Sequence, residues 1–222
     1  MAVTTTVGDI IVAALAKSTK NRANAIATSA TELTGAVYRA ICGAFSLAAS
    51  VDPTFFGKSA SVALSGGAWP FPEDAESIFR IENLSGEEVA LVPQDDKGAE
   101  RVRPAVFRVG RSFYGAGNSG DPTTGNLVFW YSKRPSALTA TTDVLDSMWL
   151  EAYNELLVLD LAIYLAVKDG RDDEAQLLGA ERSKWADLFS AHIVHATVNE
   201  VRRFGNVGQF NANTRTPLGG AS

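Results

Sequence analysis

Residues 115–120, Gly-Ala-Gly-Asn-Ser-Gly, spell a G-x-G-x-x-G motif, the phosphate-binding fingerprint of dinucleotide-binding folds. The fingerprint works only between a strand and a helix, because the helix N-terminus supplies the N–H groups that hold pyrophosphate. Pro122, Gly125 and then β-type residues follow here, and no helical pattern does. We therefore interpret the motif as the loop of a β-hairpin that joins residues 105–114 to residues 126–132, and we expect no cofactor.

Other residues that could do chemistry do not form complete sets. His192 and His195 are spaced to lie on one helix face, as two metal ligands can, but these are the only histidines and no cysteine or acidic pattern completes a site. A position at a packing or subunit boundary explains the two histidines better than a metal site does. The acidic pairs at 95–96 and 172–173 are interpreted as a turn tip and a helix start. With no G-x-S-x-G or Walker motif, we expect no catalytic or metal-binding residues and no enzyme.

Composition and charge favour a globular protein with its own core. The 222 residues are 46% hydrophobic and 20% charged, and the net charge of −5 argues against a general nucleic-acid coat. The charge alternates in blocks: residues 73–100 are acidic, 101–134 are basic and 143–187 are acidic again. Such blocks could pair opposite faces of neighbouring subunits, although a solvated surface explains any single block equally simply.

The single cysteine and the lengths of the apolar runs indicate the cellular environment in which the protein folds. Cys42 excludes an intramolecular disulfide framework, and its Ala-rich surroundings favour a small buried side chain over a nucleophile. The first residues lack a secretory pattern, and the run at 161–167 is far shorter than the roughly 20 residues that span a bilayer. The sequence thus predicts a soluble, intracellular protein without a membrane partner.

The elements that must position these residues fall into a helical part and a β part. Apolar spacing predicts two helices in residues 1–53, with Asp9 and Thr31 as N-caps. Glycine, proline and short β-type runs at 54–135 predict a compact antiparallel sheet of four or five strands, in which Ser85-Gly86 turns a hairpin.

Helical patterns return in residues 136–204. Asp146 or Ser147 can cap the first of these helices, and Gly170 can end it. A second helix starts among acidic residues and ends before Gly205, and residues 205–222 have no periodicity and predict an extended tail. The predicted fold class is α+β: a bundle of about four helices with an inserted small antiparallel sheet and an extended C-terminal tail.

One stretch resembles a known family. The sequence VFWYSKRPSALTATTDVLD runs from a strand through a proline and a leucine to an aspartate that leads into a long helix. It is similar to the strand-to-helix junction of head–tail adaptor (connector) proteins of tailed bacteriophages, and the matching positions are Tyr131, Pro135, Leu138 and Asp143. TVGDIIVAAL near the start resembles the first helix of these proteins, and the order of helices, β insertion, helices and tail agrees over most of the chain.

The resemblance implies a structural virion protein at the head–tail interface, or neck, made in the host cytoplasm. Such adaptors form a homo-oligomeric ring, typically a dodecamer, beneath the portal protein. The ring extends the DNA channel and docks the next neck or tail protein, and DNA passes through without sequence-specific binding. Acidic residues that face the channel would let DNA slide.

Two sets of contact residues follow as hypotheses. The C-terminal segment of such adaptors inserts along the portal, which makes Phe204, Phe210, Asn213 and Arg215 candidate portal contacts. The glycine-rich tip is a candidate assembly loop, with Gly115, Gly117, Asn118 and Gly120 as its residues. The alternatives are another neck or tail protein, such as a stopper or terminator dominated by β structure, and a cellular ligand-binding protein or enzyme.

Overall fold

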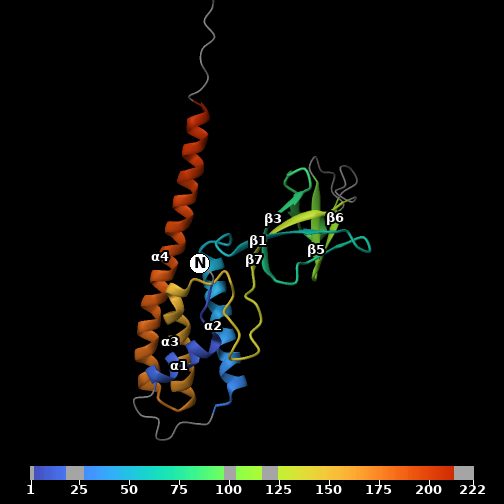
Figure 1. The fold of residues 1–222 in the computed structure, drawn as a ribbon. Helices are drawn as coiled ribbons and strands as arrows, with labels where there is room; N and C mark the ends of the chain where they lie inside the picture. The colour runs from blue at the N-terminus through green and yellow to red at the C-terminus, as the bar shows by residue number, and fades with distance from the viewer. Residues whose placement is uncertain (1–2, 19–27, 98–103, 117–124, 213–222) are drawn as a thin grey trace, which may run out of the picture.

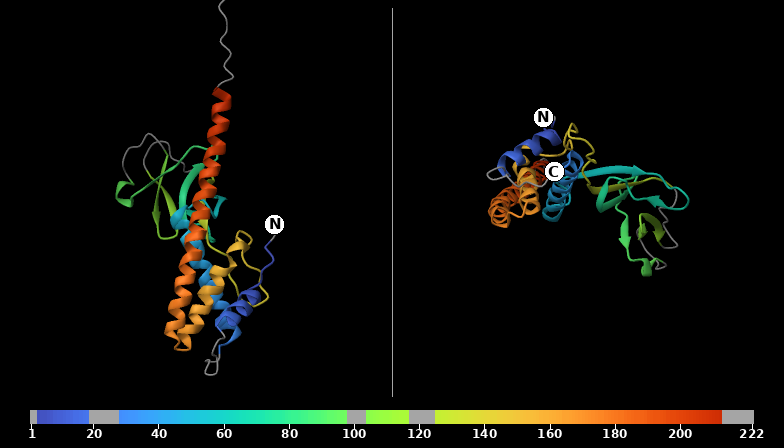
Figure 2. Two further views of the ribbon diagram at one scale, coloured as in Figure 1. Left: turned by 90° about the vertical axis from the view of Figure 1, so that its left-hand side faces the viewer. Right: turned by 90° about the horizontal axis from the view of Figure 1, so that it is seen from below.

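The part of the chain that the structure describes contains four α-helices and an inserted β part. The computed structural model describes residues 3–18, 28–97, 104–116 and 125–212. Helices α1 (Val7–Ser18) and α2 (Ala30–Val51) precede the β part, and α3 (Asn154–Lys168) and α4 (Asp172–Ala212) follow it. Figure 1 shows α2, α3 and α4 side by side, α1 lying across them and the β part next to them, and the view from below in Figure 2 separates the two bodies. We call them the bundle (α1–α4) and the β-module (residues 54–135). The α+β class and the inserted β structure are confirmed.

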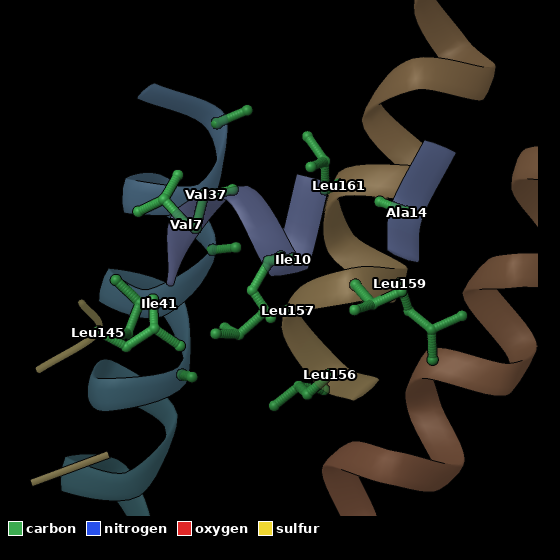
Figure 3. Close-up of a cluster of buried hydrophobic side chains, with 14 of the residues drawn as sticks. Val7, Ile10, Ala14, Val37, Ile41, Leu145, Leu156, Leu157, Leu159 and Leu161 are labelled. Carbon is green, nitrogen blue, oxygen red and sulfur yellow. The ribbon is translucent and has the colours of Figure 1, made fainter. Parts of the chain in front are cut away.

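The bundle packs around α3, which is apolar on nearly every side and contacts the other three helices. Figure 3 shows leucines of α3 pointing toward α1 and α2, with Leu157 next to Ile10. Such a helix is stable only when neighbours cover each face. The side chains of α3 with 1% exposure or less include Leu156, Leu157, Leu159 and Leu161.

Helix α2 shows why an apolar helix need not be a membrane span. By length and composition alone, α2 could cross a membrane. Its buried residues, among them Val37, Ile41 and Phe45, belong to the same core cluster as the buried residues of α3. That packing is typical of a core helix of a folded bundle.

The helix starts differ in detail from those predicted. Thr6, not Asp9, begins α1: the Thr6 backbone N donates to Asp9 Oδ2 at 2.8 Å and the Asp9 backbone N donates to Thr6 Oγ1 at 3.2 Å. This reciprocal pair is a capping box with aspartate in the place of the usual glutamate. Ser29, not Thr31, caps α2, because its Oγ accepts from the Glu32 backbone N at 3.1 Å.

The β-module consists of two small sheets. In the first, β7 (Leu127–Lys133) lies between β1 (Gly57–Val62) and β3 (Ala75–Asn83), and both pairings are antiparallel. The second has the order β2-β6-β5-β4. Its strands are β2 (Trp69–Pro70), β6 (Ser112–Ala116), β5 (Ala105–Val109) and β4 (Ala90–Val92), and β4 pairs with β5 in parallel. The predicted single sheet is thus divided in two, because β7 pairs with β1 and β3 and not with β6, the strand that precedes it in the sequence.

Large aromatic side chains fill the space between these strands. Trp69, Phe113, Phe129 and Tyr131 are each 1% exposed or less and belong to one buried cluster. Trp69 Nε1 donates to the Gly125 carbonyl oxygen at 3.0 Å, so its polar atom is satisfied inside the cluster. Pro70 lies on β2 at the sheet edge, where a strand can lack one backbone donor.

Helix α4 continues past its predicted end. It runs for 41 residues, about 60 Å at 1.5 Å per residue, and passes through Gly205. An interior glycine costs a helix only about 1 kcal/mol relative to alanine, and no proline follows before Pro217. Residues 205–212 are therefore helical, and the remainder of the predicted tail, 213–222, lies outside the described residues.

Candidate assembly site

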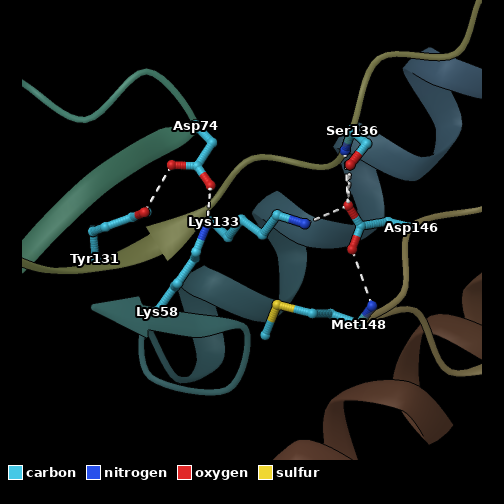
Figure 4. A network of polar contacts seen from close by, with 7 residues as sticks. All are labelled: Lys58, Asp74, Tyr131, Lys133, Ser136, Asp146 and Met148. Carbon is cyan, nitrogen blue, oxygen red and sulfur yellow. Dashed lines mark hydrogen bonds and ion pairs between the residues drawn. The ribbon is translucent and has the colours of Figure 1, made fainter. Parts of the chain in front are cut away.

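A buried carboxylate holds the start of the junction, the segment 133–151 between β7 and α3. The Asp146 side chain is fully buried, and its Oδ2 accepts from Lys133 Nζ at 2.6 Å, from the Ser136 backbone N at 2.8 Å and from Ser136 Oγ at 2.9 Å (Figure 4). Its Oδ1 accepts from the Met148 backbone N at 3.0 Å. Burial raises the pKa of Asp146, but these donors outweigh it and the net pKa is lowered.

Asp146 therefore does not cap α3 as predicted. Its bond to the amide two residues ahead makes an Asx-turn, and α3 begins only at Asn154, after a 3-10 turn at Glu151–Tyr153. The Asp146 side chain instead binds residues of the junction, and it neutralises the mostly buried Lys133 at the end of β7.

A second carboxylate ties the strands of the first sheet together. Asp74 Oδ1 accepts from the Tyr131 hydroxyl at 2.7 Å, and Asp74 Oδ2 accepts from Lys58 Nζ at 2.7 Å (Figure 4). These residues come from the approach to β3, from β7 and from β1. Burial raises the pKa of Asp74, and the two donors more than offset it, so the pKa is lowered. Tyr131 thus anchors β7 at the point where the chain leaves the β-module.

The other three predicted junction positions lie along the same path. Pro135 is buried, and Leu138 is 8% exposed and belongs to the core of the bundle. Asp143 Oδ2 accepts from the backbone N atoms of Thr139 and Ala140 at 2.7 and 2.9 Å, and these bonds lower its pKa. Asp143 therefore stabilises a turn in the junction, on the path that leads to α3.

The junction also closes over the start of α1. The Val7 backbone N donates to the Asp143 carbonyl oxygen at 2.9 Å, and the Leu145 backbone N donates to that of Thr5 at 3.0 Å. The four predicted positions do not meet in one cluster. Each fixes a successive point of a path that clamps the β-module onto the first and third helices.

Glu151 is a structural residue that sequence reasoning missed. Its Oε1 accepts from the backbone N atoms of Thr4 and Thr5 at 2.6 and 2.7 Å and from the Thr5 hydroxyl at 2.8 Å. These donors lower its pKa to about 2. The threonines at 4–6 are recognisable in the sequence as hydrogen-bond donors. Nothing in the local sequence indicates that their acceptor is Glu151, almost 150 residues away.

The two histidines lie on the exposed side of α4. The His192 ring lies 6.1 Å from the Phe55 ring and 5.5 Å from the Tyr153 ring, centroid to centroid. Both histidines are largely exposed. In the described ranges, no group of three or more His, Cys, Asp or Glu side chains is arranged to hold a metal ion. The acidic pairs take their predicted places, at a 3-10 turn (Gln94–Asp96) and in the first turn of α4.

Cys42 is only partly buried, in contrast to the small core side chain expected. It lines a pocket of about 340 Å³ where α2 faces the junction, together with Tyr38, Glu76 and Arg134. Burial raises the pKa of the Cys42 thiol. A thiol with a raised pKa carries less of the nucleophilic thiolate, so this environment disfavours reactivity.

The glycine motif does not form a hairpin tip. Residues 105–109 and 112–116 form a hairpin of their own, with Gly110 at φ 59° in its turn. Strand β6 belongs to the second sheet and β7 to the first, so the chain after Gly115 crosses between sheets. Gly115 itself pairs with Val106, whereas Gly117, Asn118 and Gly120 lie outside the described residues. The pairing of β6 with β7 was wrong because partner choice depends on non-local packing.

The predicted portal contacts divide between two regions. Phe204 and Phe210 lie on α4, whereas Asn213 and Arg215 lie outside the described residues. The last side chain of α4 with a described partner in the bundle is Thr197, whose hydroxyl donates to Asp52 at the end of α2. Figure 1 shows the end of α4, in red, extending beyond the other helices.

These features describe an α+β protein whose polar clusters hold its elements together. The comparison with protein-family models identifies the group: the model described as SU10 adaptor protein matches residues 5–209. The chain therefore belongs to the SU10 adaptor protein family, and it is a bacteriophage adaptor protein, a structural component of the virion. The resemblance inferred from the sequence is confirmed at the level of the family. A search of curated proteins found no match.

Proposed function

We propose that this protein is a head–tail adaptor whose copies form a ring beneath the portal, extend the DNA channel and dock the next neck or tail component. The observation that carries the proposal is the end of α4. Residues 198–212 continue the helix for about 22 Å beyond the last described contact with the bundle. An isolated helix of this length is marginal in water, so contact with another protein would stabilise this segment.

The composition of the segment supports a protein partner. It includes Val201, Phe204, Val207 and Phe210 among polar residues, and aromatic anchors often carry much of the binding energy at interfaces. Arg202 and Arg203 precede the first phenylalanine and add donors for acidic groups. Phe204 and Phe210 are the proposed portal anchors, with Asn213 and Arg215 as further contacts.

The clamped junction supports a role in a symmetric assembly. A ring closes only if each copy presents its surfaces at the same relative angle. Asp146, Asp143 and Glu151 fix the path from the β-module to the bundle at three successive points. The negative net charge agrees with a channel that DNA passes through without being held.

The test is binding to the cognate portal. The intact protein should form rings on portal particles seen by electron microscopy, and deletion of 204–222 should abolish binding. The double substitution Phe204→Ala/Phe210→Ala should weaken it more than about tenfold, as the loss of two aromatic anchors predicts. Val167→Ala, at an exposed position on α3, serves as the matched control and should bind like the intact protein.

The outcomes separate the parts of the proposal. Rings that form equally well without 204–222 would remove the portal role of the segment. An intact protein that neither binds the portal nor forms rings would overturn the adaptor role itself. Far-ultraviolet circular dichroism of each variant must match the intact protein, so that a lost fold is not taken for a lost contact.

A further inference from the structure

An open pocket of about 390 Å³ lies at the end of the bundle from which α4 extends. Its walls come from the 3-10 turn at Glu151–Tyr153, from the two residues before that turn, from Val3 and from His192 of α4. We call it the aromatic pocket, after the rings of Trp149, Tyr153 and His192. Figure 1 shows the start of α3 next to α4, near the level where α4 leaves the other helices. The pocket therefore opens close to residues 198–212, the segment that we propose as the portal contact.

The walls of the aromatic pocket are mainly apolar. The Tyr153 ring lies 5.5 Å from that of His192, centroid to centroid, and Trp149 lines the pocket with them. Trp149 Nε1 donates to Asn154 Oδ1 at 2.8 Å, so the polar atom of the indole is already paired and its ring presents an apolar surface. An apolar cavity of roughly 150 Å³ is large enough to bind benzene. The aromatic pocket is larger than that, so it has room for a leucine or phenylalanine side chain of a partner.

Two lining residues carry hydrogen-bonding groups that the chain itself does not use. Within the part of the chain that the structure describes, neither the Tyr153 hydroxyl nor the His192 imidazole forms a hydrogen bond. Burial raises the pKa of Tyr153, so its hydroxyl is protonated at neutral pH and can donate. Glu151, the acidic lining residue, already accepts from the backbone N atoms of Thr4 and Thr5. Apolar walls with a few available polar groups are typical of a binding pocket.

The aromatic pocket and the proposed portal anchor Phe210 belong to the same face of α4. Position 210 follows position 192 by 18 residues, which is about five turns of an α-helix. The two positions therefore lie on one face of the helix, about 27 Å apart at 1.5 Å per residue. A partner element that lies along α4 against Phe210 reaches the aromatic pocket at its other end. This continuity with the proposed portal contact favours the portal protein, and not a second copy, as the occupant of the pocket.

We propose that the aromatic pocket receives a large apolar side chain of the portal protein, carried by the portal element that lies along residues 198–212 of α4. Side chains that dominate the affinity of an interface often fill such pockets in the partner, where neighbouring contacts exclude water. Two contacts about 27 Å apart would fix the angle between α4 and the portal element, which one contact near the free end of the helix does not do. This inference rests on the proposed portal binding and adds a second contact site to it.

Substitutions that fill the pocket test the inference. Ala152 lines the pocket and is exposed, so Ala152→Trp should occupy the pocket without disturbing the core. Binding to the cognate portal should weaken more than about tenfold, as expected for the loss of a buried anchor. Ala152→Asp is smaller and places a charge among apolar walls, and it should weaken binding as well. Ala180→Trp and Ala180→Asp, at an exposed position of α4, are the matched controls and should bind like the intact protein. Circular dichroism and melting temperature of each variant verify the fold.

Photocrosslinking identifies the occupant of the pocket. A small diazirine amino acid at position 152 should join this protein to the portal protein in assembled particles, whereas the same group at position 180 should not. A product of two copies of this chain would mean that a neighbouring copy fills the pocket. A crosslink to residues 1–2 of the same chain would mean that the chain covers its own pocket. Either result overturns the inference, as does portal binding that both Ala152→Trp and Ala152→Asp leave unchanged.

The variant Phe204→Ala/Phe210→Ala separates this inference from the proposed function. If that double substitution weakens portal binding and the Ala152 variants do not, the portal contact of α4 stands and the aromatic pocket is not part of it. Weaker binding by both sets of variants, with unchanged binding by the Ala180 controls, supports both. An intact protein that does not bind the portal at all rejects the proposed function, and the inference that rests on it is rejected with it.

Discussion

The bundle and the β-module bury their apolar surface with different kinds of side chain. Among the described residues, the core cluster of the bundle contains 27 buried residues, of which four are aromatic, including Phe56 from the start of the β-module, whereas the cluster between the strands contains ten, of which five are aromatic. A small module cannot bury many aliphatic side chains, so large rings provide more buried area from each position. The β-module therefore depends on a few rings, whereas the bundle distributes its stability over many aliphatic contacts.

The largest expected effect tests this difference at one ring in each core. Phe189 of α4 is fully buried, and its ring lies 4.9 Å from that of Tyr153 and 5.8 Å from that of Trp149. Phe189→Ala should cost about 3–5 kcal/mol of unfolding free energy, because it leaves a cavity among packed rings. Phe113→Ala, at a 1% exposed position of β6, should cost a similar amount.

Hydrogen exchange should distinguish the two substitutions. Faster exchange in Phe189→Ala is expected across α3 and α4, and faster exchange in Phe113→Ala should stay within the second sheet. Urea unfolding followed at 222 nm gives the free energies, and an exposed substitution, Leu177→Ala, provides the control. Exchange that spreads equally through both bodies in both variants would mean that bundle and β-module unfold as one unit.

The next effect concerns the joint between the two regions. Asp146→Asn keeps the shape of the side chain but leaves Lys133 mostly buried without its carboxylate. Breaking a buried ion pair by removing one partner costs about 3 kcal/mol or more. Asp173→Asn, in the exposed first turn of α4, is the control. If the free energies of the two variants agree in urea unfolding, Asp146 does not hold the joint.

The joint also shows where sequence reasoning succeeds and where it stops. The helices of the bundle were predictable because their stripes, such as Val37 and Ile41 on α2, reflect local periodicity. Strand pairing was not predictable, because β4 joins β5 in parallel and β6 joins β2, choices set by contacts far apart in sequence. The prediction that Asp146 caps a helix failed for the same reason. An aspartate before an apolar run is a typical N-cap, and its ion pair with Lys133, thirteen residues earlier, is visible only in the folded structure.

A smaller effect is expected where α2 passes into β1. A side-chain carbon at Gly57 would lie 2.5 Å from the Thr54 carbonyl oxygen, closer than atoms can approach without backbone movement. Gly57→Ala should therefore destabilise the protein by about 1–3 kcal/mol through local strain. Gly43→Ala on α2 meets open space and should be neutral or slightly stabilising, because alanine favours helix. Equal melting temperatures of the two variants would contradict the close approach at Gly57.

The smallest effect is one of pH, and it acts on the bundle alone. The pKa of Glu151 is about 2 in the folded protein and about 4.5 without its partners, so folding favours the ionised form. Its contribution to stability is then fully present above about pH 4.5 and is lost as the pH falls toward 2. In Glu151→Gln the neutral amide cannot provide this contribution, so urea midpoints of the variant should fall less steeply between pH 5 and pH 2 than those of the intact protein. Parallel midpoints over that range would mean that the tie from Glu151 to Thr4 and Thr5 does not persist in solution.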